Sequence, residues 1–257
     1  MPGTDGPDAP RGPSLVWDIL AQVVAERAAA TGRTRLDIVD VGAGTGGFAV
    51  RIARRGHQVT VVDPSPDALA AARWRAAEAG VTLTEVQGDA VDLPALVGEP
   101  GAGGGGADLV ICHSVLEYVD SPSAALAAVA RVLRPGGTVS VLAANAVAAV
   151  LQRALTGKYA EAQALLPGTA RSGAGADPAP ASPSAARRFT LSELTALIQA
   201  AGLRAGDAHG IRIFSGLLPG AGADPGAAEA LRELEEAAAS CPPLRDIAAR
   251  LHVLGHR

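Results

Sequence analysis

Glycines and a carboxylate cluster in residues 40–47, which read Asp-Val-Gly-Ala-Gly-Thr-Gly-Gly. This stretch closes an apolar run at residues 36–41 and opens a helical pattern at residues 46–55. Glycines at such a turn let the backbone bend tightly and approach a ligand without interference from a Cβ atom. We therefore expect a ligand at the carboxyl end of the first strand, where open α/β sheets bind ligands.

Two classes of ligand fit this loop. Read as Gly-x-Gly-x-x-Gly, residues 42–47 match the dinucleotide pattern, with Asp63 placed 63 − 42 = 21 residues beyond to hold a ribose. Read as Asp-x-Gly-x-Gly-x-Gly, residues 40–46 match the pattern of S-adenosylmethionine sites. The carboxylate of Asp40 would repel a pyrophosphate at the helix N-terminus, whereas it suits the cationic sulfonium and ammonium groups of S-adenosylmethionine.

The elements that must position this loop alternate between apolar runs and helical patterns. Such alternation is typical of βαβ units and a parallel sheet. Strands or extended segments are expected at residues 36–41, 58–62, 82–86, 107–112, 137–142, 203–214 and 251–254. Helices are expected at residues 15–30, 46–55, 66–79, 123–133, 192–201 and 227–239, with Glu117 and Tyr118 starting a helix after the fourth strand.

The domain organisation follows from the same pattern. Residues 1–13 are rich in Pro, Gly and Asp and are expected to form a flexible tail. Residues 14–257 are expected to form a single domain, with a cofactor-binding half at 14–143 and a substrate-side half at 144–257. The Ala/Pro/Ser/Gly tract at 167–186 is expected to be a mobile segment of the second half.

The composition excludes several classes of protein. The chain has 257 residues, 48% of them hydrophobic, and a net charge of −4, which gives no nucleic-acid signature by itself. Cys112 and Cys241 are too few for a disulfide framework, and no Cys, His or carboxylate cluster has zinc spacing, so no metal is expected. The N-terminus lacks a signal-type apolar region and no apolar run is long enough for a membrane span, so we expect a cytoplasmic protein.

Five motifs together resemble those of class I S-adenosylmethionine-dependent methyltransferases. They are VDVGAGTGGFA, VTVVDPS, GDA, DLVICHSVLEYV and LRPGG, and the resemblance covers about residues 14–143. It implies a Rossmann-like α/β fold, with a seven-stranded, mostly parallel sheet, helices on both faces and an antiparallel last strand at ARLHVLGHR. It also implies an enzyme that uses S-adenosyl-L-methionine to methylate an acceptor.

Cofactor-binding residues are expected from the loop, from the ends of the next two strands and from the end of the fourth. Asp63 is placed to accept hydrogen bonds from two ribose hydroxyls, and Asp89 to accept one from the adenine amine. The full set is Asp40, Gly42, Ala43, Gly44, Gly46, Asp63, Pro64, Asp89, Ala90 and His113.

A narrower resemblance extends past the cofactor half. HSVLEYVDSP, Asn145, the segment 156–159, the segment 210–214 and the segment 250–253 look like those of bacterial tRNA 5-carboxymethoxyuridine carboxyl-methyltransferases. This resemblance implies a methyl ester formed on a modified wobble base of tRNA. The family's lysine run is absent and its N-terminal segment is shortened here, so a small-molecule carboxyl, hydroxyl or amine acceptor is the alternative. An NAD(P)-dependent oxidoreductase is a remote alternative, and the oligomeric state stays open.

Residues for the chemistry are expected at strand ends in both halves. A carboxylate acceptor is already ionised at pH 7 and needs only an orienting group, for which Arg212 and Arg250 match the family. His113 would accept a proton from a hydroxyl or amine acceptor, so His113 and Arg212 are the catalytic candidates. Substrate-binding candidates are Asn145, Tyr118, Arg188, Arg212 and Arg250. A basic path for tRNA phosphates would use Arg153, Lys158, Arg171, Arg187, Arg188 and Arg212.

Overall fold

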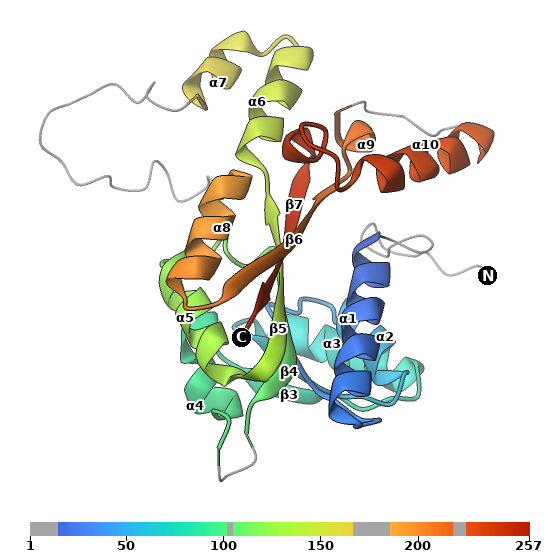
Figure 1. Ribbon diagram of the computed structural model, residues 1–257, viewed down its shortest axis with the longest axis vertical. Coiled ribbons are helices and arrows are strands. Elements are labelled where there is room, and N and C mark those ends of the chain that lie inside the picture. Colours follow the sequence, from blue (N-terminus) through green and yellow to red (C-terminus); the bar gives the residue numbers. More distant parts are fainter. Residues whose placement is uncertain (1–14, 102–104, 167–185, 218–224) are drawn as a thin grey trace, which may run out of the picture.

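The computed structural model describes residues 15–101, 105–166, 186–217 and 225–257. Seven strands within these ranges form one sheet (Figure 1). The strands are β1 Asp37–Val41, β2 Gln58–Asp63, β3 Thr84–Gln87, β4 Ala107–His113, β5 Leu133–Ala144, β6 Arg204–Ile211 and β7 Arg250–His256. The predicted tail and all of the predicted mobile segment except Ala186 lie outside the described residues.

The sheet has the order β3-β2-β1-β4-β5-β7-β6. Every neighbouring pair from β3 to β5 is parallel, whereas β7 runs antiparallel to both β5 and β6. The predicted Rossmann-like class, with an antiparallel last strand, is therefore confirmed. The predicted extended segment 203–214 is a strand only as far as Ile211, after which the chain turns into a short helix.

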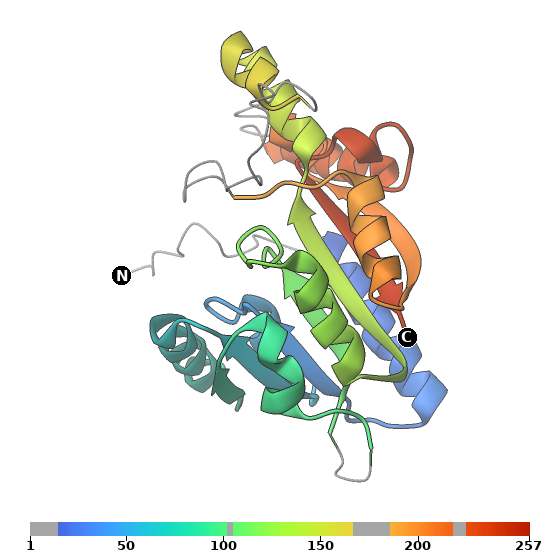
Figure 2. The same ribbon diagram turned by 90° about the vertical axis from the view of Figure 1, so that its left-hand side faces the viewer.

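Helices cover both faces of the sheet (Figure 2). They are α1 Leu15–Thr31, α2 Gly47–Ala53, α3 Pro66–Glu78, α4 Leu93–Val97, α5 Pro122–Val132, α6 Ala146–Leu155, α7 Tyr159–Ala164, α8 Leu191–Ala200, α9 Phe214–Leu217 and α10 Pro225–Ala238. Ser65 caps α3 by accepting a hydrogen bond from the backbone of Ala68, and Thr190 and Glu193 form a capping box at the start of α8. None of the described helices is long and apolar enough to cross a membrane.

Two apolar layers hold the helices to the sheet. Val39 and Val41 of β1 pack in the layer beneath α5 and α8, whereas Ile38 packs in the layer beneath α1 and α2. This division follows from the alternation of side chains along a strand. The consequence for the site is that the carboxyl ends of the strands are held rigidly between two layers of packed side chains.

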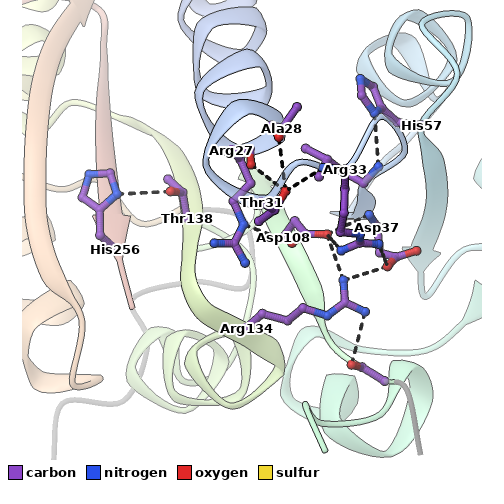
Figure 3. A network of polar contacts seen from close by, with 12 residues as sticks. Arg27, Ala28, Thr31, Arg33, Asp37, His57, Asp108, Arg134, Thr138 and His256 are labelled. Carbon is purple, nitrogen blue, oxygen red and sulfur yellow. Dashed lines mark hydrogen bonds and ion pairs between the residues drawn. The ribbon is translucent and has the colours of Figure 1, made fainter.

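The amino ends of β1, β4 and β5 meet in a charged cluster (Figure 3). The carboxylate of Asp108 is buried and accepts hydrogen bonds from Arg27 at 3.0 Å, Arg33 at 2.8 Å and Arg134 at 2.8 Å. It also accepts one from the backbone N–H of Asp37 at 3.0 Å. Burial alone would raise the pKa of Asp108, but these donors outweigh it and the pKa is lowered. Arg134 of the LRPGG motif therefore links β5 to β1 and β4 through its ion pairs with Asp37 and Asp108.

Candidate functional site

A pocket of about 470 Å³ lies at the carboxyl ends of β1 to β4. The walls come from the glycine loop, from the end of β2, from the residues after β3 and from the turn after β4. The lining residues are Val41, Gly42, Val62, Asp63, Pro64, Gly88, Asp89, Ala90, Ser114, Val115, Tyr118, Val119 and Asp120. This is the edge of the sheet at which the sequence predicts the cofactor.

The glycine loop requires its glycines. Gly42, Gly44 and Gly46 have φ values of +61°, +52° and +73°, a region that residues with a Cβ atom rarely adopt. A Cβ atom on Gly42 would lie 2.6 Å from Cγ2 of Val115, and one on Gly46 would lie 2.9 Å from Cβ of Ala72. Gly42 therefore allows the loop to approach the opposite wall of the pocket.

Asp63 joins the loop to the second strand. Its Oδ2 accepts a hydrogen bond from the backbone of Gly44 at 3.0 Å, and its Oδ1 accepts one from the backbone of Ser65 at 2.9 Å. The residue is 7% exposed and lines the pocket. Each carboxylate oxygen has a further lone pair, so Asp63 retains the capacity to accept hydrogen bonds from a ligand.

The pocket wall is acidic. Asp63, Asp89 and Asp120 line it, and none of its lining residues is a lysine, arginine or histidine. A wall of this charge repels a pyrophosphate and attracts a cationic ligand. This arrangement argues against the dinucleotide ligand that the glycine spacing alone left open.

Asp40 does not face the pocket in which the sequence predicts the cofactor. It does not line the pocket but lies buried on the α2 side of β1, where its carboxylate accepts a hydrogen bond from the backbone of Ala49. Burial raises the pKa of Asp40 to about 7, and the nearby charge of Asp63 acts in the same direction. The wall carboxylates, and not Asp40, therefore set the charge that a ligand in this pocket meets.

The predicted cofactor set divides into two groups. Five of its ten residues line the pocket, namely Gly42, Asp63, Pro64, Asp89 and Ala90. The other five, Asp40, Ala43, Gly44, Gly46 and His113, do not line it. Gly44 and Gly46 shape the loop, so their contribution is to the backbone rather than to the wall.

His113 is the last residue of β4, immediately before the pocket residues Ser114 and Val115. Its Nε2 lies 2.7 Å from Oγ of Ser140, and its ring meets the ring of Phe48 edge-on at 5.1 Å. Burial lowers the pKa of His113 to about 3, and the positive charge of Arg250 contributes. The imidazole is therefore neutral at pH 7, with its Nδ1 buried and without a hydrogen-bond partner among the described residues.

The chain turns sharply between His113 and the wall that follows. Ser114 has φ +58°, a left-handed conformation that is uncommon outside glycine, and its backbone N–H donates to the carbonyl of Leu142 at 2.8 Å. The prediction that Glu117 and Tyr118 begin a helix is wrong, because they lie in a turn and α5 starts only at Pro122.

Two sets of contacts fix this turn. Oε1 of Glu117 accepts a hydrogen bond from the backbone of Ala144 at 2.9 Å, and Arg250 lies 3.8 Å from the same oxygen. The guanidinium group of Arg187 donates to the carbonyls of Val119 and Asp120, the latter at 3.0 Å. The turn is thereby held as a wall of the pocket, with the ring of Tyr118 74% exposed at its rim.

Asn145 serves the fold rather than a substrate. It is 2% exposed, and its Nδ2 donates to the carbonyls of Asp246 at 2.9 Å and Ala248 at 2.8 Å. Its Oδ1 accepts from the backbone of Val147 at 2.9 Å and so caps α6. Both amide donors are used inside the protein, so the structure gives Asn145 a structural role, and its substrate contact stays a prediction.

The predicted arginines do not converge on the pocket. Arg212, with φ +60°, lines a separate hollow of about 270 Å³ between the end of β6 and α10. Arg188 lines a third, about 700 Å³, beside α8. Arg250 pairs with Glu117 behind the turn. The structure therefore does not bring Arg212, Arg188 and His113 together on the wall that Asp63 lines.

Sequence reasoning missed seven lining residues, namely Val41, Val62, Gly88, Ser114, Val115, Val119 and Asp120. Most are immediate neighbours of residues that the motifs did identify. The exceptions are Val115 and Asp120, whose signal is their place in HSVLEYVD. Arg187, predicted to lie on a path for phosphates, instead holds the turn with its guanidinium group.

Comparison with known proteins agrees with this geometry. Residues 39–141 match a family model described as a methyltransferase domain. A tRNA 5-carboxymethoxyuridine methyltransferase of Escherichia coli (strain K12) is 31% identical over 156 residues, covering 60% of this chain and 56% of the relative. A ubiquinone biosynthesis O-methyltransferase of Xanthomonas campestris pv. campestris (strain B100) is 33% identical over 165 residues, covering 64% of each.

The chain thus spans less than two thirds of the length of these curated relatives. A crystal structure of an S-adenosylmethionine-dependent methyltransferase from Mesorhizobium loti matches the fold with a TM-score of 0.57 at 21% identity, over 94% of this chain and 97% of that one. Residues 39–141 are therefore similar to a methyltransferase domain, and the sheet that contains them has the fold of the S-adenosylmethionine-dependent methyltransferase structure it matches.

Proposed function

We propose that the chain is an S-adenosyl-L-methionine-dependent methyltransferase. The observation that carries this proposal is the acidic pocket at the glycine loop, in which Asp63, Asp89 and Asp120 face a ligand without a basic side chain in the wall. When bound, S-adenosylmethionine supplies a methyl group on a positively charged sulfur. A carboxylate-lined wall suits that charge.

The residues present fit the cofactor. Asp63 would hold the ribose, because its two oxygens keep free lone pairs after accepting from Gly44 and Ser65. Asp89 is exposed after β3 and would accept from the adenine amine, with Pro64 and Ala90 as apolar walls.

The chain's own contribution is alignment. Methyl transfer is an in-line displacement, and its rate depends on holding the acceptor close to the methyl group in the right direction. The turn at residues 115–120 faces the glycine loop across the pocket, and Glu117 and Arg187 fix it from behind. We propose that this turn presents the acceptor and that Tyr118, at the rim, forms part of its binding surface.

The charges of the described residues favour a small-molecule acceptor. Of the predicted basic path, Arg153 and Lys158 each lie 3.5 Å from Glu161, and Arg187 is bound to backbone carbonyls. Arg188 and Arg212 line two different hollows. Because RNA affinity depends on a continuous row of cations, this arrangement gives it little support.

A methyl ester on a tRNA wobble base is the second candidate. What favours it is the 31% identity with the relative named a tRNA 5-carboxymethoxyuridine methyltransferase. The cytoplasmic location expected from the sequence is compatible with either acceptor. An NAD(P)-dependent oxidoreductase is not supported, since the wall carboxylates oppose a pyrophosphate.

The test has two stages. Calorimetry should give micromolar binding of S-adenosylmethionine and no binding of NAD, and the reverse result would overturn the proposal. Purified protein with labelled S-adenosylmethionine is then offered bulk tRNA bearing 5-carboxymethoxyuridine and, separately, a panel of small acids, phenols and amines. Label in the wobble nucleoside, identified by mass spectrometry, would establish the tRNA acceptor instead of the small molecule.

A further inference from the structure

A row of polar side chains crosses four neighbouring strands within the layer beneath α1 and α2. The row runs from His113 on β4 through Ser140 on β5 and His252 on β7 to His209 on β6. The register places Leu142 of β5 opposite both His113 and His252, and His252 opposite His209. Most side chains in this layer are apolar, so a row of four hydrogen-bonding groups there opposes the ordinary preference for burial.

The members of this row are within hydrogen-bonding reach of one another. Nε2 of His113 lies 2.7 Å from Oγ of Ser140, which lies 2.7 Å from Nε2 of His252. Nδ1 of His252 lies 3.5 Å from Nδ1 of His209. Ser140 and His252 are fully buried, whereas His209 lines a cavity of about 400 Å³ along α1. The row thus connects the end of β4, beside the cofactor pocket, to a second opening of the molecule.

Two hydrogen-bond orientations satisfy the row. In one, His113 donates from Nε2 to Ser140, Ser140 donates to Nε2 of His252, and His252 donates from Nδ1 to His209. In the other, every donor and acceptor is exchanged. A neutral imidazole has one donor and one acceptor nitrogen and a hydroxyl has both functions, so either orientation is chemically complete. Passing from the first orientation to the second takes up one proton at Nδ1 of His113 and releases one from Nε2 of His209.

The first orientation is the expected resting state. It leaves Nδ1 of His113 as a bare lone pair, whereas the second leaves a buried N–H without a partner among the described residues. Orphaned buried N–H groups are rarer than under-satisfied acceptors in folded proteins. His113 therefore rests with a buried Nδ1 that carries no proton and can accept one.

The charged neighbours are consistent with neutral rings. Burial lowers the pKa of all three histidines, and Arg250 also lowers that of His113. At the outer end, Asp207 acts to raise the pKa of His209 and Arg245 to lower it. Rings that are neutral at pH 7 keep one donor and one acceptor nitrogen, as the row requires.

We propose that His113, Ser140, His252 and His209 form a proton relay, and that the acceptor of the proposed methyl transfer is therefore a hydroxyl or an amine. The inference rests on the proposed function. In such a transfer a bond forms between the acceptor atom and the methyl carbon, the sulfur–carbon bond breaks, and the acceptor's proton must leave. A carboxylate acceptor is already ionised at pH 7 and releases no proton.

The proton passes in four steps. Nδ1 of His113 takes it from the acceptor while Nε2 of His113 gives its own proton to Oγ of Ser140. The Ser140 hydroxyl proton moves to Nε2 of His252, and the Nδ1 proton of His252 moves to Nδ1 of His209. The Nε2 proton of His209 then leaves to water in the outer cavity. One proton enters, one leaves, and the row is left in its second orientation, from which ring and hydroxyl rearrangement restores the first.

The first test needs no acceptor. Nitrogen-15 NMR of the imidazole rings should show His113 neutral between pH 6 and 8, protonated on Nε2 and bare at Nδ1, with His252 protonated on Nδ1. Nδ1-protonated His113 in the resting protein would overturn the proposal. Because this measurement does not involve S-adenosylmethionine, failure of cofactor binding by calorimetry would count against the proposed function alone.

The second test follows the product and the rate. The probe is 3,4-dihydroxybenzoate, which carries phenolic hydroxyls and a carboxylate on one ring. A methyl ether supports the relay and a methyl ester contradicts it. If the protein does not methylate this probe, the nitrogen-15 NMR spectra of the imidazole rings decide whether the relay is rejected.

With a hydroxyl or amine acceptor, Ser140→Ala should lower kcat at least tenfold, with KM unchanged, and shift the acid limb of the pH–rate profile. Ser140→Thr, which keeps the hydroxyl, should restore most of kcat. The matched control is Thr138→Val, on the same strand and face, whose hydroxyl bonds to His256 outside the row. Equal losses in Ser140→Ala and Thr138→Val would indicate a structural effect and overturn the relay.

Discussion

The two ends of the central strands use aspartate in opposite ways. At the amino ends, Asp37 and Asp108 are surrounded by Arg27, Arg33 and Arg134, and the carboxylate of Asp108 is completely enclosed (Figure 3). At the carboxyl ends, Asp63, Asp89 and Asp120 line a pocket whose wall contains no basic residue. The first cluster satisfies its charges within the protein, whereas the second leaves its acceptors for a ligand.

This difference separates a structural role from a binding role without reference to sequence motifs. A carboxylate that is buried among arginines stabilises the fold through those contacts, and it is not exposed to a ligand. An acidic wall without counter-charges costs stability through mutual repulsion, and a cationic ligand removes that cost. Substitutions at the amino ends should therefore lower the free energy of unfolding, whereas substitutions at the carboxyl ends should lower the affinity for the cofactor.

The largest effect is expected for Asp108→Ala. Removing this carboxylate leaves three arginines without a buried partner, and breaking a buried ion pair typically costs about 3–5 kcal/mol of unfolding free energy. Urea unfolding measures the loss. The Kd for S-adenosylmethionine, measured well below the melting temperature, should stay within about twofold of the wild-type value, and a large change would remove the distinction between the two ends.

Asp40→Asn tests a buried carboxylate that forms no ion pair among the described residues. Because the folded pKa of Asp40 is raised to about 7, its contribution to stability is fully present below the unfolded pKa and is lost as pH rises through 7. Wild-type protein should therefore lose about 2–3 kcal/mol of this contribution between pH 5 and 8. The variant should lack the loss, so urea curves recorded at both pH values should converge at pH 5 and separate at pH 8; parallel curves would contradict the assignment.

Asp63→Ala should act mainly on affinity. Charge-assisted hydrogen bonds contribute about 1.5–3 kcal/mol, so a loss of about 2 kcal/mol would raise the Kd for S-adenosylmethionine roughly 30-fold. Calorimetry measures this value, and unchanged affinity would remove Asp63 from the ribose role. The backbone N–H groups of Gly44 and Ser65 lose a partner as well, so a smaller loss of stability should accompany the change.

Asp37→Ala should have the smallest effect and serves as the control for Asp63→Ala. Its side chain is 30% exposed and its ion pairs with Arg33 and Arg134 are screened by water, so at most about 1 kcal/mol of stability should be lost. Cofactor affinity should not change. A stability loss as large as that of Asp108→Ala would show that the cluster acts as one unit rather than through its buried member.

Much of the fold follows from local signals. The apolar runs predicted all seven strands, and Ser65, Thr190 and Glu193 are residues of the types and spacing that mark helix starts. Helices α4, α6, α7 and α9 were not predicted. The signal for α6 was present in Asn145, a good N-cap residue, but the resemblance to a family motif favoured a substrate role for it.

The site was predicted less completely because its geometry depends on facing directions and on distant pairings. Side chains alternate along a strand, so Val39 and Val41 on one face place Asp40 on the other, away from the pocket. The row from His113 to His209 requires the register of β4, β5, β7 and β6, which no local pattern encodes. Arg212 was carried over from a motif, and its surroundings in a different hollow could not be read from the sequence.

The place of β7 has a consequence for the order in which the protein is made. β7 is synthesised after β6, yet it lies between β5 and β6 and pairs with both. Until the ribosome has delivered residues 250–256, β6 has no neighbouring strand in the sheet. His209 and Ser140 likewise remain separated until His252 arrives between them. Nascent chains that stop before this strand would expose two unpaired edges, which chaperones and proteases can distinguish from the finished fold.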